Sequence, residues 1–503
     1  MANHLFDALM AAGAAADKPF LRLEDGASVT YGGLVALSGQ IANALVQLGV
    51  RPGDRVAVQV EKTPEALITY LGCVRAGAVF LPLNTAYTPA EVDYFLADAE
   101  PVLCLCDPAA EAALRPSATR IGARLETLDA AGQGSFRSLL DAQSPAFVDV
   151  ARGPDDLAAI LYTSGTTGRS KGAMLTHDNL ASNARTLVAA WRFTADDVLL
   201  HALPIFHTHG LFVATNTLLM AGGSMLFLPK FDLAALLALL PQATTLMGVP
   251  TFYSRLLSAP DFTRAAAAHM RLFISGSAPL SAEVHREFRA RTGHAILERY
   301  GMTETNMNTS NPHDGDRRAG TVGLPLPGVC LRIADPDTGR ELPQGEIGII
   351  EVKGPNVFSG YWRMPEKTAQ EFRADGFFIT GDMGQVSADG YVSIVGRAKD
   401  LVISGGFNIY PAEVEGLIDE LPGVAESAVI GVPHADLGEA VVAVVAPKPG
   451  AVLDEAALRA ALDGRLARFK QPRRVIILPA LPRNTMGKIQ KAALRETYRD
   501  LLA

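Results

Sequence analysis

Thr163-Ser-Gly-Thr-Thr-Gly-Arg-Ser-Lys-Gly172 is the most informative stretch of the chain and the best indicator of its fold. A β-rich apolar run at residues 157–162 leads into it, and Thr176-His-Asp-Asn179 behind it is predicted to begin a helix. Its glycines would let backbone N–H groups converge on phosphate oxygens, its hydroxyls add donors, and Lys171 adds a point charge. The stretch therefore predicts a polyphosphate-binding loop in an α/β fold.

The loop differs from a Walker A motif. Only two residues separate Gly165 from Gly168, and no Lys-Ser or Lys-Thr pair closes the loop. A shorter fragment of this kind would be an ordinary flexible turn, whereas ten consecutive residues of this composition favour phosphate binding.

The pattern along the chain predicts two units. Up to about residue 320, short β-rich runs alternate with helical stretches such as 64–76, which indicates βαβ units and mainly parallel sheets. Closely spaced strands with Gly/Pro turns then predict an antiparallel barrel or sandwich. The last ~100 residues have the size of a small α+β domain. We therefore predict a large domain, 1–398, and a small domain, 399–503, with a hinge near Lys399.

Composition excludes several classes of protein. A net charge of -8 over 503 residues gives no electrostatic footprint for nucleic acid or an anionic membrane. The four cysteines lack metal-site spacing and suggest a reducing compartment. The N-terminus carries Asp7 and no basic start, and the longest uncharged stretch, 202–229, is broken by histidines and glycines. We expect a cytoplasmic protein with no nucleic acid and no membrane as partners.

Four later motifs extend the pattern of the loop over nearly the whole chain. They are Glu298-Arg-Tyr-Gly-Met-Thr-Glu304, Thr380-Gly-Asp382, Gly396-Arg397 and Pro482-Arg-Asn-Thr-Met-Gly-Lys488. With the loop, they resemble the acyl-adenylate-forming (ANL) superfamily, which includes acyl-CoA synthetases, luciferases and amino-acid adenylation domains. The resemblance implies a large N-terminal domain of two doubly wound α/β subdomains plus a β-barrel. It also implies a small, mobile α+β C-terminal domain that rotates between two half-reactions.

Adenylation of an acid requires cations, because a carboxylate and the α-phosphate of ATP are both negative. By resemblance, Lys488 would contact both groups and stabilise the transition state. Glu304 would hold Mg²⁺ together with Thr167, and Thr303 would donate to the α-phosphate. Taken alone, Lys488 and Glu304 would be ordinary surface residues.

The resemblance also implies an ATP site. Asp382 would accept hydrogen bonds from the ribose, Arg397 would assist, and Tyr300 would stack on adenine, although Asp382 alone would be a plain turn aspartate. The complete set of predicted ATP-binding residues is Thr163, Ser164, Gly165, Thr166, Thr167, Gly168, Lys171, Ser277, Ala278, Pro279, Glu298, Arg299, Tyr300, Gly301, Asp382 and Arg397. For coenzyme A, the resemblance implies passage of the pantetheine arm past Ser404, Gly405 and Gly406, which could equally form a simple turn.

Two features bear on the acid. His207 matches the family position beside the acyl pocket, although a packed core histidine is the alternative for His207 or His209. Arg255 interrupts the apolar segment Gly248-Val-Pro-Thr-Phe-Tyr-Ser-Arg-Leu-Leu257, and a buried arginine needs an anion such as a second carboxylate. The alternative is that Arg255 pairs with an internal acid and reaches the surface.

The chain also resembles malonyl-CoA synthetases in particular. The shared stretches are Arg255, Ile274-Ser-Gly-Ser-Ala-Pro279 and Met302-Thr-Glu-Thr-Asn-Met-Asn-Thr-Ser-Asn311. This implies that Arg255 and Ser277 bind the distal carboxylate of malonate, with Arg286 as a weaker candidate.

The sequence thus predicts a ligase that joins malonate to coenzyme A through an acyl-AMP intermediate with release of AMP and pyrophosphate; methylmalonate is an open alternative as the acid. The alternatives are a synthetase for another short or medium acid, an amino-acid adenylation domain, a luciferase-like oxygenase, and a non-catalytic nucleotide-binding homologue. A lysine acyltransferase and a deacylase acting on Lys488 are further predicted partners, because neutralising that cation would switch the enzyme off.

Overall fold

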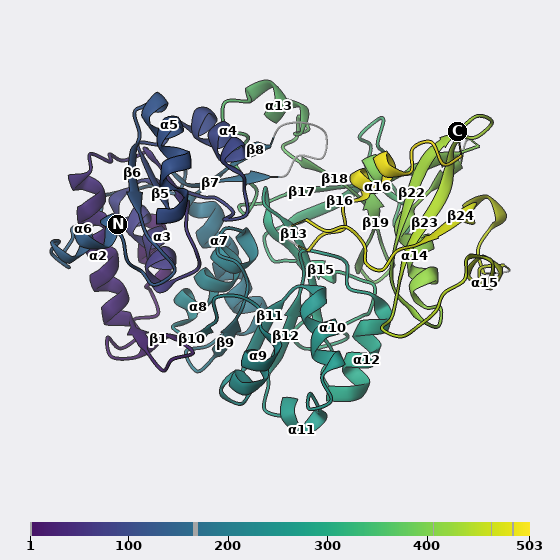
Figure 1. Ribbon diagram of the computed structural model, residues 1–503, viewed down its shortest axis with the longest axis horizontal. Coiled ribbons are helices and arrows are strands. Elements are labelled where there is room, and N and C mark those ends of the chain that lie inside the picture. The colour runs from purple at the N-terminus through teal and green to yellow at the C-terminus, as the bar shows by residue number, and fades with distance from the viewer. Residues whose placement is uncertain (1–2, 164–169, 406, 464, 485–486, 503) are drawn as a thin grey trace.

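The computed structural model describes residues 3–502 apart from 164–169, 406, 464 and 485–486. It has a large N-terminal part and a smaller C-terminal part, which is the yellow-green region in Figure 1. The boundary at 398/399 and a hinge at Lys399 remain predictions. Across the described part of the chain, every helix is too short or too polar to traverse a bilayer.

The first sheet has the order β6-β5-β3-β4-β7-β8, and only its last pair, β7 and β8, is antiparallel. Strands such as β5 are completely buried, as expected for parallel strands covered on both faces. The strands are β3 (Arg55–Gln59), β4 (Val79–Pro82), β5 (Leu103–Cys106), β6 (Arg124–Thr127), β7 (Leu157–Thr163) and β8 (Lys171–Thr176). The helices of this part are α2 (Tyr31–Gln47), α3 (Pro64–Ala76), α4 (Pro89–Ala99), η1 (Pro108–Ala110), α5 (Glu111–Ile121) and α6 (Ser135–Asp141).

The second sheet has the order β15-β14-β13-β12-β11-β9-β10-β1-β2, with a parallel centre and antiparallel edges. Its strands are β1 (Pro19–Arg22), β2 (Ser28–Thr30), β9 (Val198–His201), β10 (Ser224–Phe227), β11 (Thr245–Gly248), β12 (Leu272–Ser275), β13 (Leu297–Met302), β14 (Asn306–Ser310) and β15 (Leu324–Pro325). Its helices are α1 (His4–Leu9), α7 (His177–Trp191), η2 (His209–Ala214), α8 (Thr215–Ala221), α9 (Leu233–Leu239), η3 (Leu240–Gln242), α10 (Pro250–Ser258), α11 (Arg264–Ala267) and α12 (Ala282–Thr292). The expected doubly wound α/β architecture is confirmed.

The expected β-barrel is wrong in one respect, because no closed barrel forms among the described residues. An open antiparallel sheet, β16-β17-β18-β19, takes its place. Four strands are too few to close around their own side chains, and the sheet instead buries Ile350, Val352 and Phe378 in the main core. The elements are β16 (Cys330–Ala334), β17 (Gly348–Lys353), α13 (Pro365–Gln370), β18 (Phe378–Val386), β19 (Val392–Arg397) and η4 (Ala398–Asp400).

The small C-terminal part is α+β, as expected. Alternate residues of its long hairpin point to opposite faces, so that Val429 and Val441 enter one core and Ile430 and Val442 another. Its elements are β20 (Val402–Ser404), β21 (Phe407–Ile409), α14 (Pro411–Asp419), β22 (Val424–His434), β23 (Gly438–Pro447), α15 (Glu455–Ala461), η5 (Arg468–Lys470), β24 (Arg474–Ile477) and α16 (Lys491–Thr497).

Candidate active site

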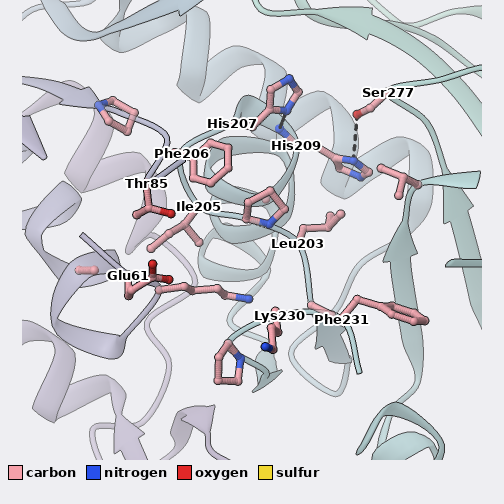
Figure 2. Close-up of a pocket in the computed structure, with 18 of the residues that line it drawn as sticks. Glu61, Thr85, Leu203, Ile205, Phe206, His207, His209, Lys230, Phe231 and Ser277 are labelled. Carbon is pink, nitrogen blue, oxygen red and sulfur yellow. Dashed lines mark hydrogen bonds between the residues drawn. The ribbon is translucent and has the colours of Figure 1, made fainter. Parts of the chain in front are cut away.

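A cavity of about 360 Å³ lies where the carboxyl ends of parallel strands from both α/β sheets meet (Figure 2). Its walls come from the segments that follow β3, β4, β9, β10, β11 and β12, and Gly487 joins them from the C-terminal part. Residues from these segments include Lys62, Thr85, His207, Lys230, Val249 and Ser277. Ligand sites of open α/β sheets form at such strand ends.

A histidine pair and a serine form one wall of the cavity. His209 Nδ1 lies 3.2 Å from Ser277 Oγ, and the His209 backbone N–H donates to His207 Nδ1 at 3.3 Å (Figure 2). Burial lowers the pKa of His207 to about 3 and that of His209 well below its usual range. Both rings are therefore neutral, polar groups at physiological pH. His209 begins the π-helix η2, a distortion that is frequent at functional sites.

Arg299 lies beside this wall. Only 3% of the residue is exposed, and a side chain on Gly276 would collide with its guanidinium, so the two are in direct contact. Nε and Nη2 of Arg299 have no hydrogen-bond partner among the described residues, and the guanidinium pairs with no described carboxylate. Burial lowers the pKa of Arg299 to about 9, and its charge reaches His207 and His209. Arg299 is not among the described lining residues of the cavity, but it lies behind the wall that His207, His209 and Ser277 form. An unpaired buried guanidinium at this position indicates a site for an anion.

Three predicted ATP-binding residues converge from three strands. The Tyr300 hydroxyl on β13 donates to Asp382 Oδ2 on β18 at 2.6 Å, and Arg397 Nε at the end of β19 lies 2.7 Å from Asp382 Oδ1. Gly301, the next residue on β13, has to be glycine because a Cβ would lie 1.8 Å from the carbonyl oxygen of Asn306.

Glu304 and Lys171 are linked by two residues that the motifs did not suggest. The Tyr361 hydroxyl lies 3.0 Å from Glu304 Oε1 and 2.7 Å from Glu371 Oε2. Lys171 Nζ lies 2.9 Å from Glu371 Oε1 and 4.0 Å from the centre of the Tyr361 ring. Burial raises the pKa of Glu304. The lysine at the end of the predicted phosphate loop and the carboxylate predicted to bind the metal thus belong to one polar network.

Lys488 enters the site from the C-terminal part. Its side chain remains exposed, yet the preceding Gly487 lines the cavity and the Lys488 amine is within electrostatic range of residues from the large part. Desolvation there lowers the pKa of Lys488, Arg397 lowers it further, and Asp382 and Glu304 oppose the shift. The ammonium group is therefore close to the ribose-binding and metal-binding candidates at once.

The comparisons with known proteins agree with this geometry. A family model described as AMP-binding enzyme matches residues 10–362. The chain belongs to the AMP-binding enzyme family. The model of the AMP-binding enzyme C-terminal domain matches residues 413–488.

Three relatives of this AMP-binding enzyme cover nearly all of it. An ATP-bound MatB from Rhodopseudomonas palustris is 61% identical, with a TM-score of 0.97 and 100% of both chains covered. A feruloyl-CoA synthase from an Amycolatopsis species is 39% identical over 94% of each chain. The malonate–CoA ligase of Arabidopsis thaliana is 34% identical over 95% of this chain and 86% of that one.

The structure corrects the expectation that Arg255 is buried in this AMP-binding enzyme. On α10, Phe252, Tyr253, Leu256 and Leu257 face the core, so the helical period places Arg255 on the exposed face. Its guanidinium lies 5.3 Å from the centre of the ring of Phe231, which lines the cavity, and neither Arg255 nor Arg299 is itself among the described lining residues. What distinguishes the two arginines is burial, because Arg255 is exposed and Arg299 is not. The segment is a helix, and its apolar stripe excludes the arginine.

Arg286 also lies outside the cavity. It is exposed on α12 and is 3.4 Å from Glu420 of the C-terminal part. Sequence patterns could not have separated Arg286 and Arg255 from Arg299, because only the tertiary structure determines which guanidinium is buried. The sequence did single out Arg299, as part of the motif Glu298-Arg-Tyr-Gly-Met-Thr-Glu304, but predicted that it binds ATP.

The other predicted residues are distributed as follows. Thr163 ends β7, Ala278 and Pro279 follow Ser277, Thr303 is in the turn after β13, and Lys399 is in η4. Ser404 is buried, Gly405 is exposed with a φ of 57°, and neither is among the described cavity-lining residues. Ser164, Gly165, Thr166, Thr167, Gly168 and Gly406 lie outside the described residues.

Glu298 leads to a prediction about stability. Its Oε1 accepts from the Leu280 N–H at 3.2 Å, its Oε2 has no partner among the described residues, and burial raises its pKa to about 8. Between about pH 4.5 and pH 8, the folded state therefore holds a proton that the unfolded state releases, so the stability contributed by this group falls as pH rises. Glu298→Gln should abolish that loss, which is at most about 1.4 kcal/mol per pH unit.

Melting curves of the wild type and Glu298→Gln at pH 6 and pH 9 check this prediction. The variant should gain melting temperature relative to the wild type at the higher pH. The same difference at both pH values would contradict the protonation of Glu298 in the folded state.

Proposed function

We propose that the protein is an ATP-dependent, AMP-forming malonate–CoA ligase. A malonate carboxylate oxygen attacks the α-phosphorus of ATP and pyrophosphate leaves. The coenzyme A thiol then attacks the carbonyl carbon of malonyl-AMP, and AMP leaves. The family match and the malonate–CoA ligase among the relatives support this activity, with ATP, coenzyme A and the acid as small-molecule substrates.

The observation that carries the choice of acid is the unpaired Arg299. A monocarboxylic acid would leave this buried cation without a partner, which costs more than a satisfied pair. The distal carboxylate of a short diacid would supply the partner, with Ser277 and the neutral His207 and His209 adding hydrogen bonds. We therefore propose Arg299, in place of Arg255 and Arg286, as the main ligand of that carboxylate.

The polar clusters support roles for the ATP-binding residues. Asp382, held by Tyr300 and Arg397, would accept from the ribose hydroxyls, and Tyr300 would also border adenine. Lys171 would leave Glu371 for the phosphates, and Thr303 would donate to the α-phosphate. Lys488 would bridge the α-phosphate and the reacting carboxylate.

Glu304 fits a magnesium ligand. It is a buried carboxylate with a raised pKa and one hydroxyl contact, so it lacks a cation of its own in contact. Among the described residues, no group of three or more acidic, His or Cys side chains could hold a metal alone. Mg²⁺ commonly uses one or two carboxylates together with substrate phosphates, and there it would neutralise phosphate charge. Thr167 is the second predicted ligand.

Further parts of the proposal concern the C-terminal part. We propose that Ser404, Gly405 and Gly406 approach the pantetheine arm and that the small domain pivots near Lys399. We also propose that acylation of Lys488 inactivates the enzyme, and mass spectrometry that found only unmodified Lys488 under all growth conditions would refute it.

The described cysteines are free, which is consistent with the predicted cytoplasmic location.

Pyrophosphate release with a panel of acids, with and without coenzyme A, tests the function. Malonate should support pyrophosphate release and thioester formation, and methylmalonate should support both reactions as well. Acetate and ferulate should be at least about 100-fold less efficient substrates because they leave Arg299 unpaired. Adenylation without thioester formation would favour a different acceptor, and no acid-dependent pyrophosphate release would favour a non-catalytic homologue.

A further inference from the structure

Lys62 is a half-buried lysine in the cavity wall whose amine contacts only neutral acceptors among the described residues. Its Nζ lies 2.8 Å from His201 Nδ1, 2.9 Å from the His201 carbonyl oxygen and 2.5 Å from the Leu228 carbonyl oxygen. It also lies 4.3 Å from the centre of the Phe227 ring, and the described residues offer it no carboxylate partner. Desolvation lowers the pKa of Lys62 well below its usual range, whereas the three acceptors together match the three protons of an ammonium group and leave none for a ligand.

The contacts of Lys62 join the two α/β sheets. Lys62 follows β3 of the first sheet, whereas His201 ends β9 and Leu228 follows β10 of the second. The cavity lies at this junction, as Figure 2 shows by the neighbouring Glu61 on one side and Leu203 and Lys230 on the other. Lys62 therefore ties together the two halves from which the cavity is built.

His201 extends this connection to the π-helix. Its Nε2 lies 2.9 Å from the Gly210 carbonyl oxygen, and Lys62 donates to its Nδ1, so the two bonds select the Nε2–H tautomer. Burial lowers the pKa of His201 to about 3, and Lys62 lowers it further, which keeps the ring neutral. Gly210 is the second residue of η2, next to His209 and its Ser277 contact.

We propose that Lys62 and His201 are positioning residues that hold the π-helix, and with it His207 and His209, in register with Ser277 for binding of the acid. Lys62 sets the tautomer of His201, and His201 donates to the Gly210 carbonyl, which also accepts from the Thr215 hydroxyl at 3.0 Å. The bond from His201 fixes the start of the π-helix and so places the His209 ring against Ser277. The inference rests on the proposed function, since it assigns the acid to this wall of the cavity.

Kinetics of Lys62→Met, His201→Phe and the double variant test the proposal. Methionine keeps the aliphatic bulk of Lys62, and phenylalanine keeps the ring beside Phe227. Each single variant should raise the malonate KM about five- to tenfold, as expected for one lost hydrogen bond, with the ATP KM within about twofold. Because both residues act through the same bond to Gly210, the double variant should resemble the worse single variant.

Lys18→Met is the matched control. The Lys18 amine also donates to two carbonyl oxygens, of Ala195 and Gly222, and it lies outside the described lining of the cavity. This variant should leave the malonate KM unchanged. In ¹⁵N spectra of histidine-labelled protein, the His201 signal is identified by its loss in His201→Phe. In the wild type this signal should show the Nε2–H tautomer, and in Lys62→Met its chemical shift should change.

The outcomes separate the two levels of the proposal. Wild-type protein without malonate-dependent activity would refute the proposed function. Active wild type combined with a malonate KM in Lys62→Met equal to that of the wild type would refute only the positioning role. Multiplicative effects in the double variant, or a lowered kcat with every KM unchanged, would show that Lys62 supports the fold alone.

Discussion

Replacement of Lys488 by methionine is expected to lower the rate of acyl-adenylate formation by about 10²–10³-fold, the usual cost of removing a preorganised charge from a transition state. The side chain lies within electrostatic range of Glu304, Asp382 and Arg299. Its charge also contributes to the lowered pKa of His207. Single-turnover pyrophosphate release measures the step directly.

Lys491→Met provides a matched control three residues further along the chain. Lys491 is the first residue of α16, and its amine lies 2.5 Å from the carboxylate of Glu415. Its replacement should therefore have no influence on adenylation. A Lys488→Met enzyme that adenylates malonate at more than a tenth of the wild-type rate would remove Lys488 from the first half-reaction.

The pH profile offers a second check on Lys488. The active form is the cation, so the rate should fall as pH rises through its pKa, and desolvation places that pKa below 10.5. Lys488→Arg keeps its charge over this range and should move the alkaline limb upward even if its rate is low. An alkaline limb at the same pH in both proteins would assign that limb to another group.

Arg299→Met is expected to raise the malonate KM by about 30- to 1,000-fold, because one partner of a buried charge pair is lost from the complex. The ATP KM should stay within about threefold. The preference for malonate over acetate in adenylation should also disappear, because the variant lacks the cation that binds the second carboxylate. Competition between malonate and acetate for adenylation measures this ratio.

Thermal stability distinguishes this effect from misfolding. Arg299 has no partner for Nε and Nη2 in the described protein, so Arg299→Met should leave the melting temperature unchanged or raise it. Arg255→Met decides between the two arginines. A larger increase of the malonate KM in Arg255→Met than in Arg299→Met would restore the assignment made from the sequence.

Much of the architecture and of the nucleotide site was predictable, because the signals are local. Pro64 at the first position of α3 and the glycine after Ala76 mark both ends of that helix, and Thr176 caps α7 as predicted. The convergence of Tyr300, Asp382 and Arg397 followed from motifs whose order along the chain is that of a family. The prediction of a β-barrel was wrong because the sequence patterns of the strands do not reveal whether the two edge strands of a sheet pair with each other.

The acid site was harder to predict, because it depends on burial. Arg255, Arg286 and Arg299 have the same side chain, and an arginine within an apolar segment is equally consistent with a pocket and with the outer face of a helix. Tyr361 and Glu371 belong to no motif. Tyr361 reaches Glu304 across 57 residues of the chain, and Glu371 reaches Lys171 across 200 residues. The Lys62–His201 bond likewise spans 139 residues.

By itself, the sequence indicated the α/β fold, because short-range periodicity is a property of neighbouring residues, and its motifs identified the adenylate-forming family. The phosphate loop at residues 163–172 remains a prediction. Only the tertiary structure decided which arginine lacks a partner, that the histidine pair lies on a π-helix, and that Lys62 spans both sheets. These features depend on the desolvation of charges by residues distant in the chain, and desolvation is set by packing.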